Sequence, residues 1–137
     1  MNTSRSHAVH FYEAPESLLD LLEAFVREGL ARKERVVLIT LQERWRLLAD
    51  RLGTEDRARL VFLDSREVLS RIRVDGMPDP DRFAALTREL LEKMAGRPFR
   101  VFGDAVDLLA QEGDFEGAVR LEELWNDLRR SRAFPLF

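Results

Sequence analysis

The sequence predicts an α/β domain in which helices cover both faces of a mainly parallel sheet, in three α/β/α layers. Short and almost continuously apolar runs recur along the chain, as expected for strands that are buried on both faces. Segments with apolar residues at helical spacing lie between these runs, and this alternation is typical of three-layer domains. With 137 residues we expect a single domain over 1–137, in which residues 1–6 are flexible.

Five runs are predicted to be the strands of this sheet. In chain order they are HAVHFY (7–12), RVVLIT (35–40), RLVFLD (59–64), FRVFGD (99–104) and AFPLF (133–137). Broad apolar stripes predict helices over 18–30, 83–94 and 118–128.

Local signals mark where several helices begin and end. Thr40–Glu43 and Asp64–Glu67 have the spacing of a capping box directly after a strand. Asp79 and Pro80 are typical of an N-cap followed by the first helical residue. The segment 74–81 is rich in Gly, Pro and Asp and predicts a loop, and Gly113 is expected to end a short helix.

Composition excludes several kinds of function. The chain has a formal net charge of -3, so no overall positive field favours nucleic acid or an anionic membrane. It has no cysteine and only two histidines, which excludes thiolate chemistry and argues against a multi-histidine metal site. The N-terminus lacks the apolar segment of a secretory signal and the longest apolar run is VVLITL, so we expect a cytoplasmic protein without a cofactor.

The turn between the first predicted strand and helix stands where a nucleotide-binding P-loop would lie. A P-loop needs glycines that let the backbone wrap the phosphates and a lysine that meets their charge. The turn here, EAPES (13–17), has no glycine, a proline that removes one N–H donor, and two carboxylates. The sequence therefore argues against phosphate binding at this turn, and no other common catalytic motif is present.

Acidic residues follow two predicted strands. Asp64 follows LVFL and Asp104 follows RVFG, so both are expected at the carboxyl edge of the sheet, where open α/β sheets bind ligands. They are either contacts in a ligand or switch cleft or caps of the helices that follow. Glu67 favours the capping role for Asp64, whereas Asp104 is the better functional candidate.

Other candidate residues each have a structural alternative. His7 is either a buried structural histidine or, with Tyr12 and Glu13, part of a pocket lining. Trp45 is either a partly exposed contact residue or packed against the sheet. In the helix LEELWNDLRR (121–130), Glu122 and Trp125 either belong to a docking surface for a partner chain or to a solvated face above an apolar stripe.

Three long stretches together resemble the MEDS family, the sensory domain of methanogen and methylotroph regulators. They are HAVHFYEAPESLLDLLEAFVREGL, LVFLDSREVLSRIRVDGMPDPDRF and FRVFGDAVDLLAQEGDFEGAVRLEELWNDL. The resemblance implies a RecA/KaiC-like fold that has lost its P-loop, with five strands in an order of about 3-2-4-1-5. It also implies sensing of small molecules and signalling to a histidine kinase or a transcription regulator, without catalysis. The positions that carry it are His7, Phe11, Tyr12, Asp64, Pro78, Asp79, Arg100, Gly103, Asp104, Glu122, Glu123 and Trp125.

We therefore expect a sensory or protein-interaction module that acts in trans on its partner, with no direct contact to nucleic acid or membrane. Its ligand or switch residues are expected at the carboxyl edge of the sheet and in the adjoining strands: His7, Tyr12, Glu13, Thr40, Asp64, Arg100 and Asp104. The alternatives are a nucleotide-binding protein or enzyme with a site other than a P-loop, and a purely structural module that forms a homodimer.

Overall fold

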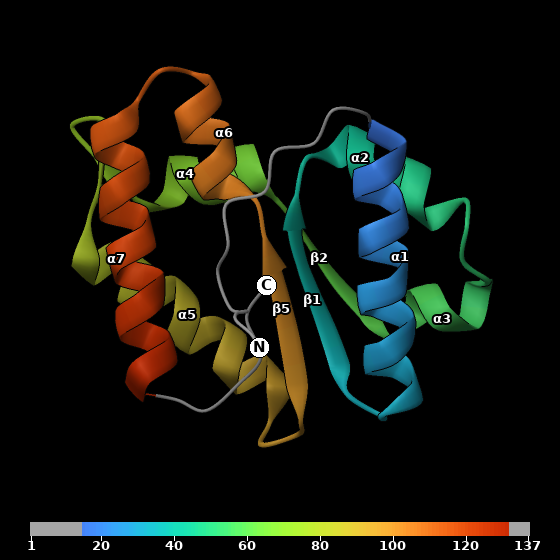
Figure 1. Cartoon of the computed structure of the whole chain (residues 1–137). Helices are drawn as coiled ribbons and strands as arrows, with labels where there is room; N and C mark the ends of the chain where they lie inside the picture. The colour runs from blue at the N-terminus through green and yellow to red at the C-terminus, as the bar shows by residue number, and fades with distance from the viewer. Residues whose placement is uncertain (1–14, 132–137) are drawn as a thin grey trace.

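A computed structural model describes residues 15–131 of the chain (Figure 1). The helices are α1 (Pro15–Ala31), α2 (Gln42–Ala49), α3 (Thr54–Ala58), α4 (Ser65–Ile72), α5 (Pro80–Met94), α6 (Ala105–Gln111) and α7 (Phe115–Ser131). The strands are β1 (Arg35–Thr40), β2 (Leu60–Asp64), β3 (Arg73–Val74), β4 (Met77–Pro78) and β5 (Phe99–Gly103).

The main sheet has β1 at its centre, in the order β2-β1-β5. Both neighbours run parallel to β1, and Val37 is paired with Val61 on one side and Val101 on the other. The parallel α/β architecture is thus confirmed, and these three strands follow the 3-2-4 part of the expected order. The strands expected at 7–12 and 133–137 lie outside the described residues, so the five-stranded order stays a prediction.

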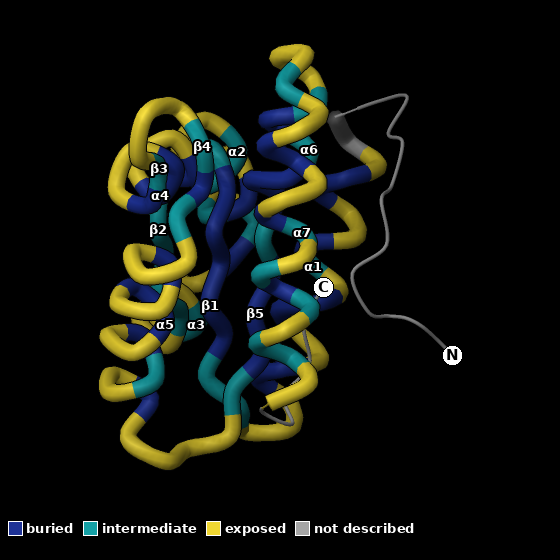
Figure 2. Tube along the Cα trace, turned by 90° about the vertical axis from the view of Figure 1, so that its left-hand side faces the viewer, coloured by how far each residue is buried: buried dark blue, intermediate teal, exposed yellow. Residues whose placement is uncertain are grey.

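Helices cover the two faces of this sheet as separate layers (Figure 1). Val37 and Ile39 of β1 face a core built mainly with α4, α5, α6 and α7. Val36 and Leu38 point the other way, into a smaller core with α1 and α2. Figure 2 shows β1 as the most buried strand, with β2 at intermediate burial and exposed outer faces on the helices. Alternate side chains of one apolar strand therefore serve two cores, which explains why β1 lacks polar alternation.

Two of the expected helix boundaries are confirmed. Asp79 is the N-cap of α5, and its carboxylate accepts a hydrogen bond from the backbone N–H of Arg82 at 3.0 Å, with Pro80 at the first helical position. Gly113 lies just beyond α6 with φ of +83° and donates its N–H to the carbonyl of Ala110. Glycine adopts this left-handed conformation without steric cost.

The two expected capping boxes are wrong. Leu41, and not Thr40, is the N-cap of α2. Asp64 does occupy the N-cap position of α4, as expected, but its side chain accepts no capping hydrogen bond. Thr40 is still part of β1, and its hydroxyl is engaged with Asp104. A side chain held by a residue from another strand is not available to the helix that follows it.

The segment expected to be a loop contains a small hairpin. β3 and β4 pair antiparallel across Asp75 and Gly76, which have φ of +52° and +80°. Positive φ at both central residues is typical of a type I′ turn, and Asp-Gly is a sequence signal for it. The short α3 is a second element that the sequence patterns did not predict.

Candidate functional site

The candidate site lies where the three parallel strands end, at the upper edge of the sheet in Figure 1. Thr40 is the last residue of β1, Ser65 begins α4 directly after β2, and Asp104 directly follows β5. Because β1 pairs with both neighbours in parallel, these positions meet at one edge. The hydrophobic packing of the strands thus places three polar side chains together.

The carboxylate of Asp104 is the centre of this group. Its Oδ2 accepts a hydrogen bond from the hydroxyl of Thr40 at 2.5 Å, and its Oδ1 accepts one from the hydroxyl of Ser65 at 2.5 Å. Thr40 and Ser65 are fully buried, and Asp104 is only 5% exposed. A buried carboxylate is stable only with donors around it, and here both oxygens have one.

Arg44 of α2 supplies the compensating positive charge. Its Nη1 donates to Oδ2 of Asp104 and also to the Thr40 hydroxyl, at 3.2 Å in the second case. The side chain of Arg44 is 27% exposed, against 6% for that of Asp104, so the pair extends from the interior to the surface. We call Thr40, Arg44, Ser65 and Asp104 the Asp104 cluster.

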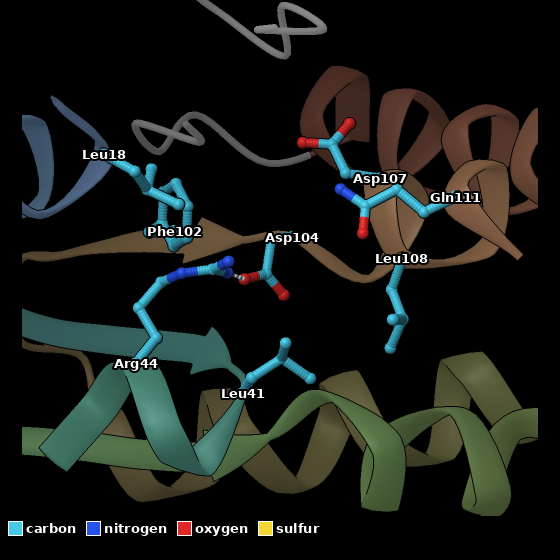
Figure 3. A pocket seen from close by; sticks show the side chains of 8 residues that line it. All are labelled: Leu18, Leu41, Arg44, Phe102, Asp104, Asp107, Leu108 and Gln111. Atoms are coloured by element: carbon cyan, nitrogen blue, oxygen red, sulfur yellow. Dashed lines mark hydrogen bonds and ion pairs between the residues drawn. The ribbon is translucent and has the colours of Figure 1, made fainter. Parts of the chain in front are cut away.

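A small pocket opens beside the Asp104 cluster, as Figure 3 shows. Side chains from α1, α2, α6, β5 and the residues directly after β1 and β5 line it: Leu18, Leu41, Arg44, Phe102, Asp104, Asp107, Leu108 and Gln111. Its volume of about 30 Å³ is roughly that of one water molecule. In this conformation the pocket has an ion pair on one wall and leucine side chains on others, and it is too small for a metabolite.

Asp64 lies near the same edge but outside the Asp104 cluster. It lines a separate groove of about 240 Å³ with residues of α2, β2 and α4: Gln42, Phe62, Leu63, Glu67, Val68 and Arg71. The Oδ1 atom of Asp64 is buried and has no hydrogen-bond partner among the residues that the structure describes. Of the predicted edge residues that the structure describes, it therefore brings Thr40 and Asp104 together and leaves Asp64 apart.

Arg100 has a different role from the one that the resemblance implied. It lies near the start of β5, and its guanidinium bonds Glu34 at 2.6 Å, the Phe25 carbonyl at 3.2 Å and Glu28 at 3.3 Å. It also lies over the Phe25 ring, 5.0 Å from the ring centre. These contacts tie β5 to α1 and to the turn after it, so Arg100 acts here as a structural residue.

The predicted docking residues differ in how far they are buried. Trp125 is 5% exposed and meets the Phe83 ring edge-on with ring centres 5.0 Å apart, so the expectation of a docking contact is corrected to a place in the core. Trp45 is half-buried and stacks on Phe62 at 5.2 Å. Glu122 is half-buried on α7. The candidates His7, Tyr12 and Glu13 lie outside the described residues.

Two members of the Asp104 cluster, Arg44 and Ser65, were not predicted. Arg44 follows Thr40 by four residues, the spacing that places two side chains on one side of a helix start. Ser65 directly follows a predicted strand, which places it at the same edge as Asp104. Neither signal is specific, because arginine and serine at such positions usually face solvent.

Two general properties of residues 15–131 bear on function. Within this range no three acidic or histidine side chains are grouped in a way that could hold a metal ion. None of the helices in this part of the chain is long and apolar enough to cross a membrane.

Comparison with known proteins gives one match. Residues 6–136 fit the family described as MEDS, the methanogen/methylotroph, DcmR sensory domain. No curated protein and no solved structure matches the chain. Since the family match covers almost the whole sequence, from before the first predicted strand to the end of the last, the chain belongs to the MEDS family of sensory domains.

Proposed function

We propose that this protein is a non-catalytic sensory module of bacterial signal transduction, in which a small molecule binds at the carboxyl edge of the sheet. The observation that carries this proposal is the Asp104 cluster. It joins the segments that follow the three strands of the main sheet through one buried carboxylate. A ligand that displaces one hydrogen bond of this carboxylate would therefore change the contacts of α2, α4 and α6 at the same time.

The ion pair between Arg44 and Asp104 is the part of the cluster that can open. Arg44 reaches Asp104 from the solvent side, while Thr40 and Ser65 are held in the interior. The neighbouring pocket has room for about one water molecule, so a larger ligand fits only if Arg44 or α6 moves. Because the closed pocket has no room for such a ligand, binding is coupled to a change of conformation.

A surface at the start of α7 is suited to pass this change to a partner. α6 begins directly after Asp104 and shares a core with α7, through residues that include Leu109 and Leu121. The first turns of α7 expose Phe115 at 67% and Val119 at 60%. We assign this apolar surface to contact with a histidine kinase or a transcription regulator, the partners that the family resemblance implies.

A ligand screen with matched arginine variants tests the proposal. Thermal unfolding of the wild-type chain is measured against a library of small metabolites, alongside Arg44→Leu and Arg46→Leu. Arg46 lies two residues further along α2, is exposed and has no ion pair with a described residue, so it is the control. A ligand of the proposed site raises the unfolding temperature of the wild type and of Arg46→Leu but not of Arg44→Leu.

Two outcomes contradict the proposal. One is a library in which no compound changes the unfolding temperature, together with native mass spectra that show no bound small molecule. The other is an equal response of Arg44→Leu and Arg46→Leu, which would move the ligand away from the Asp104 cluster.

The non-catalytic part of the proposal has its own test. Both oxygens of the Asp104 carboxylate already accept hydrogen bonds, which leaves this group poorly placed to act as a general base. We expect no hydrolysis of ATP or GTP in the presence of Mg²⁺. Saturable binding of ATP at micromolar concentration, weakened by Asp104→Ala, would favour a nucleotide-binding protein instead.

A further inference from the structure

The outer side of β2 is an open sheet edge. β2 pairs with β1 on one side, and no described strand lies on its other side. Besides the bonds within helices and strands, no described residue forms a backbone–backbone hydrogen bond with Leu60–Asp64. The first four residues of β2, LVFL, include neither a proline nor a lysine, the residues that commonly protect an edge strand from pairing.

A groove makes part of this edge accessible. The 240 Å³ groove described above runs beside the carboxyl half of β2, between α2 and α4. Phe62 and Leu63 point to opposite faces of the sheet and both line it, so the groove follows the strand edge itself. An added strand can therefore approach the backbone of β2 there.

Charge is distributed unevenly along the edge. Exposed Arg57 and Arg59 stand just before β2. At the other end, Asp64 and Glu67 line the groove, and Asp64 has an oxygen without a partner. Arg71 also lines the groove, but its charge is paired with Glu89 at 2.9 Å. Arg59 donates to the Leu30 carbonyl at 3.2 Å but has no carboxylate partner among the described residues, although Glu55 and Asp56 lie nearby in α3. Next to the strand itself, the edge thus begins with the positive charge of Arg59 and ends with the carboxylates of Asp64 and Glu67, which form no ion pair within residues 15–131.

An edge strand with opposite charges at its two ends is complementary to the same strand of a second copy when the two run antiparallel. We infer that two copies of this chain pair antiparallel through β2, about a two-fold axis at Phe62. In this register Leu60 stands opposite Asp64 of the second copy and Val61 opposite its Leu63. Arg59 then lies beside the acidic groove of the second copy, whereas a parallel pairing would bring like charges together.

This dimer continues the parallel sheets of both copies into one larger sheet. It pairs the backbone groups of β2 that face away from β1, and it brings Arg59 of each copy near the acidic groove of the other. It does not depend on the proposed ligand, so the two inferences stand or fall separately.

Disulfide cross-linking tests the position of the axis. Directly opposed residues in antiparallel strands have Cα atoms about 4.5–5.5 Å apart, within the range that a disulfide spans. The chain has no cysteine, so Phe62→Cys introduces one thiol per copy, at the axis. Mild oxidation is expected to give a covalent dimer in non-reducing electrophoresis. The control Val119→Cys places an exposed thiol on α7 and is expected to stay mainly monomeric.

Charge reversal tests the same interface without removing the Phe62 ring. Arg59→Glu and Asp64→Lys are each expected to raise the dimer dissociation constant at least about 10-fold, measured by sedimentation. Combining them exchanges the two charges and should restore the constant to within about 3-fold of wild type. A wild-type chain that stays monomeric at about 100 μM, or equal cross-linking through positions 62 and 119, overturns the inference.

Discussion

Asp104 shows how one residue can hold several elements of a fold together. Its charge is buried and is compensated by Arg44, with two hydroxyl donors on the same carboxylate. Removing one partner of a buried pair leaves the other without compensation, which usually costs more than the pair contributes. The network is therefore expected to be sensitive to loss of the carboxylate.

We expect Asp104→Ala to lower the free energy of unfolding by about 3 kcal/mol, because Thr40, Ser65 and Arg44 all lose their acceptor. Urea denaturation measures the change. Asp127→Ala is the control, because Asp127 forms an exposed pair with Arg130 and its loss should cost less than about 0.5 kcal/mol. Equal effects of the two variants would show that the cluster does not stabilise the fold.

A second residue-scale prediction concerns Gly29, near the end of α1. A Cβ atom there would lie 2.7 Å from a methyl group of Val36 and 2.9 Å from Cδ of Arg100. Replacing glycine by alanine within a helix normally stabilises it by about 1 kcal/mol. Here we expect Gly29→Ala to destabilise the protein by about 1–3 kcal/mol instead, because buried Arg100 has to shift.

Thermal or urea unfolding measures the effect of Gly29→Ala, and Gly53→Ala is its matched control. Nothing lies within 4 Å of a Cβ at Gly53, and its φ is -74°. Because Gly53 is the N-cap of α3, where alanine is less favourable than glycine, its replacement should cost about 0.5 kcal/mol but no steric clash. A stabilised Gly29→Ala variant would contradict the close packing of α1 on Arg100.

At the scale of elements, we expect substitutions at the two ends of α5 to change the stability of the protein in opposite directions. Asp79→Ala removes the acceptor of the Arg82 N–H and should cost about 1 kcal/mol. Ala95, the C-cap, has φ of +52°, which a Cβ atom disfavours, so Ala95→Gly should stabilise the protein by about 0.5–1 kcal/mol. Thermal unfolding distinguishes the two directions. Changes of the same sign in both variants would contradict the assigned boundaries of α5.

The elements also differ in how well local sequence predicted them. The four central residues of β1 are apolar because both faces are covered, and α1, α5 and α7 carry a stripe that matches their buried side. The pattern over 40–43 failed because the partner of Thr40 is Asp104, which follows β5 and lies 64 positions further along the chain, beyond the reach of a local motif. β3 and β4 have only two residues each, too few for a periodic pattern.

At the scale of the whole molecule, ion-paired surface carboxylates are expected to make the folded state less stable at acidic pH. A hydrogen bond from Arg27 is the largest cause that lowers the pKa of Glu23 below its ordinary value of 4.5, and Arg51 adds to it. The pKa of Glu43 is also lowered, by a backbone hydrogen bond first and then by Arg66. A carboxylate with a lowered pKa in the folded state stabilises the fold above its unfolded pKa, and this contribution is lost as the pH falls.

We therefore expect the double variant Glu23→Gln with Glu43→Gln to lose less stability than wild type between about pH 5 and pH 3. Unfolding temperatures measured across this range provide the test. Glu92→Gln serves as the control, since Glu92 is exposed and forms no ion pair with a described residue. A double variant with the same acid profile as wild type would show that these two groups have ordinary pKa values.

The sequence by itself determined the α/β class, the strands β1, β2 and β5, the two boundary residues Asp79 and Gly113, and the family. These follow from local apolar periodicity, from turn chemistry and from motifs spread along the chain, all of which can be read without knowing what lies nearby in space. Position after a strand also predicted that Asp64 and Asp104 lie at the carboxyl edge of the sheet.

Only the tertiary structure decided what Asp104 contacts. Its partners Ser65, Arg44 and Thr40 lie 39, 60 and 64 positions away along the chain. They meet because β1 pairs with both β2 and β5, which brings three strand ends to one edge. Strand order depends on how all helices pack on the two faces, and this is a property of the whole fold. For the same reason Arg100 and Trp125, which the resemblance grouped with the site, are held in the core by contacts that no local pattern shows.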